Sequence, residues 1–400
     1  MKFNKCFYAL LTSGALALSG CGDGSNKDVL SNGEVTLEKA SLVDVTANNA
    51  HAYSFSGECL KDGEKVVLTV NKAAPQQAPT CIDGTWTAML DLTGLNQDSS
   101  LDVTVAITGS SADSITTVIN NTFICPDNFV GVSPLNGYTS QSFCAMKYEA
   151  SLDSSGNAVS AAVVPFKNSD SLDRTEITRL CTNNGFDLIS NDEWQTIARN
   201  IESVETNWGN SQVGDALGLS RGHHGDPNGT ISSPSSDDAL ACVGTVNPST
   251  EACNLNTWNV YRRTSTLTNG DIIWDLSGNV WELVKDNISS VGDAWGSTNH
   301  PLVDFATAAP VSGSFMFTGV ADNQSRTIAE HFGPAGTYAN LTPDSDGIGQ
   351  LYPENLSVEE LLRGSASTDT SAGIFAAGLG YAKVDSGTAD NEGFRCVYRP

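Results

Sequence analysis

Basic residues are scarce in this chain, and long hydrophobic runs are absent after residue 20. The sequence contains 21 Lys and Arg against 46 Asp and Glu, which gives a formal net charge of −25. A chain of this charge repels phosphate groups, so nucleic acid and anionic lipid head groups are excluded as partners. A permanent transmembrane helix needs about 20 apolar residues, and no such segment is present. The chain also lacks a CxxC pair, which argues against a structural zinc site built from cysteines.

The first residues have the features of a secretory signal. Lys2 and Lys5 precede a short apolar run at 7–18, and small residues follow it. This order predicts export, with residues 1–20 as the signal peptide that is removed.

The end of this segment, Leu18-Ser19-Gly20-Cys21, resembles a bacterial lipobox. The resemblance implies that Cys21 carries a lipid; an ordinary signal peptide with an incidental Cys is the alternative. Gly22 in the next position favours the outer membrane, with the protein on its periplasmic or cell-surface face. Residues 21–33 are rich in Gly, Ser, Asn and Asp and are predicted to form a flexible tether.

Cysteine use agrees with export, because disulfides persist in oxidising compartments. Apart from Cys6 and Cys21, the chain has an even number of cysteines. Their spacing suggests three local disulfides and leaves two cysteines for a fourth: Cys59–Cys81, Cys125–Cys144, Cys242–Cys253 and Cys181–Cys396.

Residues 34–122 show an all-β pattern. Apolar and polar residues alternate at 52–57, 65–70, 85–90 and 101–107, and Asp62-Gly63 and Asp83-Gly84 are turn signals. About seven short strands in such a length predict a β-sandwich. The spacing Gly57-x-Cys59 … Cys81-x-x-Gly84-x-Trp86 resembles the immunoglobulin-like repeats of bacterial surface proteins, which implies a spacer.

Residues 125–400 differ in kind, with helical and irregular segments. The stretch 173–184 is amphipathic and places Ile177, Leu180 and Cys181 on one helix face. A second helix is predicted from Glu193 to about Glu202, with Ser190 as its N-cap.

Four motifs follow one another in this region: Phe143-Cys144-Ala145-Met146-Lys147-Tyr148-Glu149, Phe186-Asp187-Leu188-Ile189-Ser190-Asn191-Asp192-Glu193-Trp194, Trp274-Asp275-Leu276-Ser277-Gly278-Asn279-Val280-Trp281-Glu282, and Arg363-Gly364 with Gly393-Phe394-Arg395-Cys396. In this order they resemble the formylglycine-generating, or sulfatase-modifying-factor, family. The resemblance implies a C-type-lectin-like fold for 125–400. The predicted fold class is therefore α+β, with this domain preceded by the all-β immunoglobulin-like sandwich. In the family a Cys of the first helix can bond to the Cys of the closing motif, which again gives Cys181–Cys396.

The third motif also carries a metal prediction. Two carboxylates and two turn carbonyls within a few residues can surround one hard cation. A calcium ion lies on this segment in the family, and its ligands here would be Asp275 and Glu282 with the carbonyls of Gly278 and Val280. The alternative is that Glu282 pairs with an Arg and Asp275 caps a turn.

The enzymatic activity of the family is not expected. Formylglycine-generating enzymes use two closely spaced cysteines, which the resemblance places after the Arg-Gly motif, and residues 365–391 contain no Cys. Because that chemistry needs the sulfur, no catalytic residue is assigned. His223, His224, His300 and His331 lack metal-ligand spacing, and the pair in Gly222-His223-His224-Gly225 indicates a solvated turn.

The closing segment carries the functional prediction. Of the 28 residues from Gly364 to Asn391, 23 are Gly, Ala, Ser, Thr, Asp, Asn or Tyr. Small side chains bury little area, so an exposed middle between anchored flanks is expected. In the same fold family, the variable proteins of diversity-generating retroelements end in a hypervariable stretch before the same closing motif. The positions that fit such a scatter are Thr368, Asp369, Thr370, Gly378, Gly380, Tyr381, Asp385, Ser386, Thr388 and Asp390.

The stretch 372–379 looks like fixed framework within the closing segment, with Ile374, Phe375 and Leu379 in the core. The predicted function is a surface or periplasmic lipoprotein that binds an external protein or glycan through this segment. The alternatives are a sulfatase-modifying-factor-like enzyme of unrecognised chemistry and a structural envelope lipoprotein. A plain Gly/Ser-rich loop would have the same composition.

Overall fold

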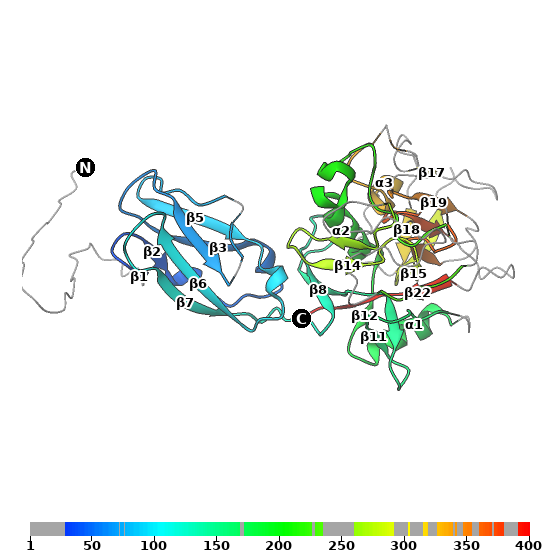
Figure 1. Ribbon diagram of the computed structural model, residues 1–400. Helices are drawn as coiled ribbons and strands as arrows, with labels where there is room; N and C mark the ends of the chain where they lie inside the picture. The colour runs from blue at the N-terminus through cyan, green and yellow to red at the C-terminus, as the bar shows by residue number, and fades with distance from the viewer. Residues whose placement is uncertain are drawn as a thin grey trace, which may run out of the picture.

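The computed structural model describes residues 29–71, 73–75, 77–168, 172–225, 229–234, 260–291, 303–304, 315–318, 326–338, 341, 347–353, 360–369, 372–379 and 391–400. The predicted signal peptide, Cys21 and most of the tether lie outside these residues. The described part is mostly β-structure with few helices, as the α+β prediction requires. Figure 1 shows two lobes, with the strands up to β7 in one and those from β8 onward in the other. No described helix is long and apolar enough to cross a membrane.

The N-terminal lobe contains seven described strands, the number expected from the sequence. They are β1 (Val29–Ser31), β2 (Thr36–Glu38), β3 (Tyr53–Glu58), β4 (Val66–Val70), β5 (Thr85–Leu90), β6 (Ser100–Ile107) and β7 (Ile115–Asn120). Antiparallel pairing gives β1–β2, β3–β5 and β4–β6–β7. Alternate residues of β3 and β4 are buried, which confirms the period-two pattern. Both predicted turns have positive φ, at Gly63 (85°) and at Asp83 (51°).

The C-terminal lobe is built on a six-stranded and a four-stranded sheet. The first has the order β17-β19-β21-β20-β15-β22 and the second β12-β23-β9-β8, with β10–β11, β13–β14 and β16–β18 as separate pairs. The strands are β8 (Phe129–Val132), β9 (Phe143–Met146), β10 (Ala150–Leu152), β11 (Ala158–Ser160), β12 (Asp187–Leu188), β13 (Thr264–Thr266), β14 (Ile272–Trp274), β15 (Trp281–Leu283), β16 (Asn287–Val291), β17 (Val303–Asp304), β18 (Phe315–Thr318), β19 (Gln350–Pro353), β20 (Leu361–Arg363), β21 (Ala377–Leu379), β22 (Glu392–Phe394) and β23 (Cys396–Tyr398).

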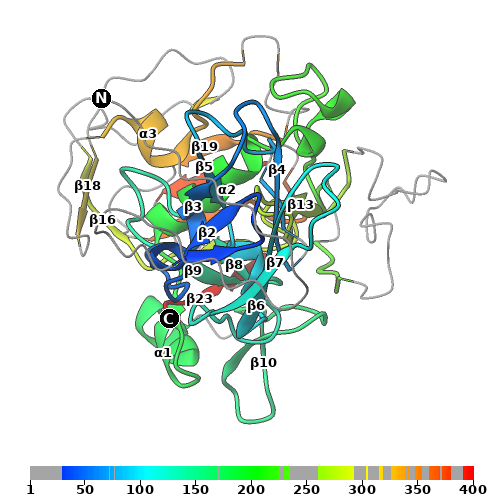
Figure 2. The ribbon, with the colours of Figure 1, turned by 90° about the vertical axis from the view of Figure 1, so that its left-hand side faces the viewer.

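Both predicted helices are present. The first, α1 (Arg174–Thr182), buries Ile177, Leu180 and Cys181 as expected. The second, α2 (Asn191–Glu202), starts at a capping box in which Ser190 accepts from the Glu193 N–H and Glu193 accepts from the Ser190 N–H. A short third helix, α3 (Ile328–Phe332), has the same type of cap. Figure 2 shows α1 and the β10–β11 hairpin at the same end of the lobe.

Three of the four predicted disulfides are present, and they tie distant segments together. These are Cys59–Cys81, Cys125–Cys144 and Cys181–Cys396, the last with a sequence separation of 215 residues. The predicted Cys242–Cys253 pair lies outside the described residues. Cys181–Cys396 links α1 to β23, so the last strand is fixed to the first helix.

Strand pairing brings the four sequence motifs together, because β22 and β23 of the closing motif lie beside strands of the other three. β23 pairs with both β9 and β12, and β15 pairs with both β20 and β22. The closing motif therefore joins the two large sheets, and residues far apart in the sequence meet around Arg395.

Candidate functional site

The closing segment starts and ends inside the six-stranded sheet. β20 and β21 pair antiparallel, while β22 pairs with β15 on the other side of β20. All residues of these three strands are buried. β21 therefore ends, and β22 begins, within one buried sheet.

Arg363 fixes the beginning of this segment. Its guanidinium is fully buried and donates to the side-chain oxygens of Asn191 (2.6 Å) and Gln195 (3.2 Å) and to the carbonyl oxygen of Phe332 (3.3 Å). Its Nε donates to the carbonyl oxygen of Ala376 at 3.2 Å. These four acceptors are neutral, and burial lowers the pKa of Arg363 to about 9.

Three backbone segments cross immediately after Arg363. The Gly278 N–H donates to the carbonyl oxygen of Gly364 at 2.9 Å. A Cβ on Gly278 would lie 2.3 Å from the carbonyl oxygen of His223, and one on Gly364 would lie 3.0 Å from that of Leu276. Both glycines also have positive φ, so a side chain is excluded at each for two reasons.

Arg395 lies at the centre of the four motifs and binds Glu282. Its Nε and Nη2 donate to the two carboxylate oxygens of Glu282 at 3.1 and 2.7 Å. The same guanidinium donates to the carbonyl oxygens of Met146 (2.7 Å) and Trp274 (2.9 Å). Arg395 and Glu282 are each 0% exposed, so this ion pair is shielded from solvent and salt.

A second buried pair joins Arg263 to Asp275. The Nε and Nη2 groups of Arg263 donate to the two carboxylate oxygens of Asp275 at 2.5 and 2.7 Å. Arg263 also donates to the carbonyl oxygens of Ser232 (2.9 Å) and Ser233 (3.2 Å). Both ionised side chains are 2% exposed.

A third carboxyl group, Glu149, lies beside these two pairs. It accepts from the Val280 N–H at 3.2 Å and from the side-chain amide of Asn279. Burial raises the pKa of Glu149 well above its usual value, and the nearby charges of Asp275 and Glu282 raise it further. The cluster therefore contains three carboxyl groups and two guanidinium groups.

This arrangement does not fit the calcium ion that the resemblance implies. Both oxygens of Asp275 and both oxygens of Glu282 already accept from a guanidinium group. Among the described residues, no group of three or more His, Cys, Asp or Glu side chains is arranged to hold a metal ion. Gly278 and Val280 lie in the same turn, where their N–H groups bond to Gly364 and Glu149.

The predicted ligand-binding residues fall into three groups. Thr368 is exposed and Asp369 is partly exposed, as a contact surface requires. Gly378 is instead buried in β21, between β19 and β20, so it is not on an exposed face. The others lie outside the described residues: Thr370, Gly380, Tyr381, Asp385, Ser386, Thr388 and Asp390.

The predicted framework of the closing segment is confirmed. Ile374, Phe375 and Leu379 are at most 1% exposed. The expectation of an exposed middle does not hold for 372–379, because every residue of this stretch is buried. Close backbone packing requires the small residues here: a Cβ on Gly373 would lie 2.3 Å from the carbonyl carbon of Ile348.

The segments 222–225 and 229–234 lie against the closing segment. The Gly225 N–H donates to the carbonyl oxygen of Asp369 at 3.0 Å, and the Ser232 N–H donates to Asn279 Oδ1 at 2.9 Å. A Cβ on Gly229 would lie 3.2 Å from Thr368. Exposed residues of these segments therefore adjoin Thr368 and Asp369.

The prediction of a solvated His223-His224 turn is wrong. His223 is 0% and His224 6% exposed. The reason is the backbone crossing, because Gly222 and His223 lie directly against Ser277 and Gly278. The ring of His224 stacks on Tyr261 with 5.2 Å between centroids. Burial and the charge of Arg221 lower the pKa of His224 to about 4.

Sequence reasoning did not identify Arg263 and Glu149 as members of the cluster. Glu149 ends the first motif, and this position could have indicated a role in the cluster. Nothing near Arg263 in the sequence indicates that it pairs with Asp275. Comparison with protein families, with curated proteins and with solved structures found no match to this chain. The functional argument therefore depends on the geometry described above.

Proposed function

We propose that this protein is a ligand-binding display protein of the bacterial outer membrane. In this proposal a lipid at Cys21 anchors the chain, the N-terminal lobe is an immunoglobulin-like spacer, and the C-terminal lobe is a lectin-like head. The head binds an external protein or glycan through the exposed parts of the closing segment.

The observation that carries the proposal is the anchoring of the closing segment at both ends. Residues 380–390 connect two buried strands, β21 and β22, of a single sheet. Thr368 and Asp369 lie between Arg363 and the buried stretch 372–379. Binding residues are often carried on segments that a rigid scaffold positions, because such a scaffold tolerates sequence changes between its fixed ends.

The proximity of the four motifs supports the resemblance to the sulfatase-modifying-factor family. The Cys181–Cys396 disulfide, which that resemblance implied, is present. A variable protein of a diversity-generating retroelement would need this combination of fixed framework and changeable insert. The structure assigns Gly378 to the framework, so it should not vary with the other nine positions.

Sequencing this locus in sister isolates tests the proposal. Differences should concentrate at Thr368, Asp369 and Thr370 and at the predicted positions within 380–390. Residues 372–379 and the N-terminal lobe should remain constant, because changes there would disturb packed strands. Variation in 380–390 no greater than that in the N-terminal lobe would contradict the diversified-receptor proposal.

A replacement experiment tests the same segment directly. A Gly-Ser repeat of equal length in place of 380–390 should leave the Tm within about 2 °C, because both flanking strands are anchored independently. Binding to a glycan microarray, or to intact cells if no glycan is bound, should be lost. The matched control replaces residues 154–155, the exposed part of the β10–β11 turn, in the same way, and this variant should bind as the unaltered protein does.

A further inference from the structure

The two buried ion pairs of the head have the same composition. Arg263 is surrounded by the carboxylate of Asp275 and two backbone carbonyls, from Ser232 and Ser233. Arg395 is surrounded by the carboxylate of Glu282 and two backbone carbonyls, from Met146 and Trp274. Each guanidinium thus occupies a cage of oxygen atoms made by one bidentate carboxylate and two carbonyls.

Such a cage is chemically similar to a calcium site. Calcium in proteins is bound by oxygen ligands, commonly carboxylates and backbone carbonyls. A guanidinium group satisfies the same oxygens through directed N–H donors, and its planar fork matches a carboxylate in a bidentate pair. Asp275 and Glu282, the two carboxylates at the ends of the third motif, are therefore each already neutralised.

We propose that Arg263 and Arg395 are the built-in cations of this fold, and that they hold the segment from Trp274 to Glu282 in place of a metal ion. A divalent cation at these carboxylates would lie beside two guanidinium groups in a low-dielectric interior, where the repulsion is strong. The segment from Trp274 to Glu282 therefore holds its conformation without calcium. This inference concerns the scaffold and is independent of what the closing segment binds.

Unaltered protein provides the first test. The Tm should differ by less than about 1 °C between solutions with excess calcium chloride and with excess EGTA, and isothermal titration with calcium chloride should show no saturable binding. An ion that bound only the folded state would raise the Tm as its concentration increased. A Tm lowered by several degrees in EGTA, or stoichiometric calcium binding that Asp275→Asn abolishes, would overturn the inference.

Variants test the role of the guanidinium. Arg263→Met leaves Asp275 buried and unpaired, so the Tm should fall by 10 °C or more by analogy with other broken buried pairs. Adding Asp275→Asn to Arg263→Met removes the unpaired charge and should recover part of this loss. The matched control is Arg179→Ala, which breaks an exposed pair with Glu176 and should change the Tm little.

The double variant separates a charge-neutralising role from simple packing. If Arg263 only fills space, Asp275→Asn will recover nothing, and the proposal for this residue is wrong. If Arg263→Met does not fold, the calcium and EGTA measurements on unaltered protein still decide the question. Partial restoration of the Arg263→Met Tm by calcium chloride would show directly that the emptied cage accepts a cation.

Discussion

Ser365 lies where the closing segment packs closely against the backbone of Leu276 and Gly278. It is fully buried and has φ of 68°, in the left-handed region that side chains other than Gly, Asn and Asp rarely adopt. Asp275 and Asn279, on the opposite segment, also have positive φ, at 53° and 67°. Asp and Asn tolerate this conformation through local hydrogen bonds of their short polar side chains, and Ser365 makes one such bond, from its Oγ to the carbonyl oxygen of Gly364.

Ser365→Gly should therefore increase the stability of the head. Removing the Cβ relieves left-handed strain, partly offset by the greater freedom of glycine in the unfolded chain, and we expect a gain of about 0.5–1 kcal/mol. Chemical denaturation with unchanged m-value would measure it. Ser367→Gly is the control, because Ser367 is equally buried but has no positive φ, and this change should destabilise. A loss of stability in Ser365→Gly would contradict the argument.

The sequence left two interpretations of the third motif open, a calcium ion or an Arg paired with Glu282. The Arg395–Glu282 pair confirms the second for Glu282, whereas Asp275 pairs with Arg263 rather than only capping a turn. Two acidic side chains at the ends of one turn are visible in the sequence. Their partners are not, because Arg263 is 12 residues from Asp275 and Arg395 is 113 residues from Glu282. Such pairings exist only once the chain has folded, so local spacing could not distinguish a metal ion from a guanidinium group.

Individual elements were predictable where the signals were local. The cap at Ser190, the apolar face of α1 and the alternation in β3 to β6 depend on residues a few positions apart, and all are present. β21 was not predictable from its sequence, Ala377-Gly378-Leu379. All three residues are buried because β21 lies between β19 and β20, and composition alone cannot distinguish a buried central strand of small residues from an exposed loop.

The Cys181–Cys396 disulfide connects α1 to the last strand, so its removal tests how the elements of the head are held. In the chain-entropy account, a cross-link that closes a loop of 215 residues contributes about 5 kcal/mol. Replacing both cysteines by Ser should lower the Tm by roughly 10 °C or more. The same replacement at Cys59 and Cys81, which are 22 residues apart, should cost less. Equal losses from the two pairs would contradict the loop-length argument.

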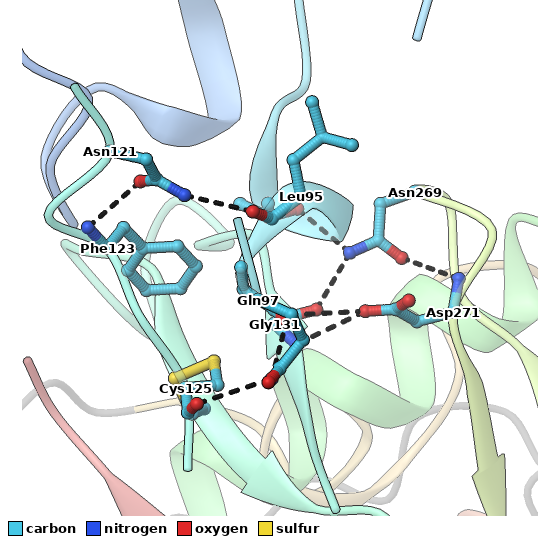
Figure 3. Close-up of a disulfide and its surroundings, with 11 residues drawn as sticks. Leu95, Gln97, Asn121, Phe123, Cys125, Gly131, Asn269 and Asp271 are labelled. Carbon is cyan, nitrogen blue, oxygen red and sulfur yellow. Dashed lines mark hydrogen bonds between the residues drawn. A yellow bond between two sulfur atoms is a disulfide. The ribbon is translucent and has the colours of Figure 1, made fainter. Parts of the chain in front are cut away.

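At the scale of the whole molecule, the two lobes are joined by a packed and hydrogen-bonded junction. The turn between β13 and β14 reaches the N-terminal lobe, where the side-chain amide of Asn269 donates to Thr93 at 2.9 Å. The same amide donates to the carbonyl oxygen of Gly131, in β8 of the C-terminal lobe, also at 2.9 Å (Figure 3). One cluster of buried residues runs from Val35 through Phe123 to Cys396. The N-terminal lobe is therefore packed against the C-terminal lobe through both apolar and polar contacts.

The β13–β14 turn also connects the junction to the buried Arg263–Asp275 pair. Arg263 directly precedes β13, and Asp275 directly follows β14. The β13–β14 hairpin therefore carries the Arg263–Asp275 pair at one end and the junction with the N-terminal lobe at the other.

Asp271, in this junction, should make the stability of the molecule depend on pH. It accepts from the Gly131 N–H at 3.3 Å and from Asn96 at 3.4 Å, and burial raises its pKa from 3.8 to about 6, with a smaller rise from Asp91 that Lys147 opposes. A carboxyl group whose pKa is higher in the folded than in the unfolded state stabilises the folded state at pH values below its unfolded pKa. For Asp271 this contribution is lost as the pH rises to about 6. Buried His224 and His331, whose pKa values are lowered to about 4, have the opposite effect as pH falls from 6.5.

Because these groups oppose one another between pH 4 and 6.5, the Asp271 contribution has to be isolated by substitution. Asp271→Asn keeps an acceptor for Gly131 but cannot ionise, so its Tm relative to the unaltered protein should rise by a few degrees between pH 4 and 6.5 and stay constant above that. Asn269→Ala removes hydrogen bonds from the same turn without a titrating group, and its loss should be the same at every pH. A Tm difference for Asp271→Asn that does not change with pH would show that ionisation of this carboxyl does not weaken the junction.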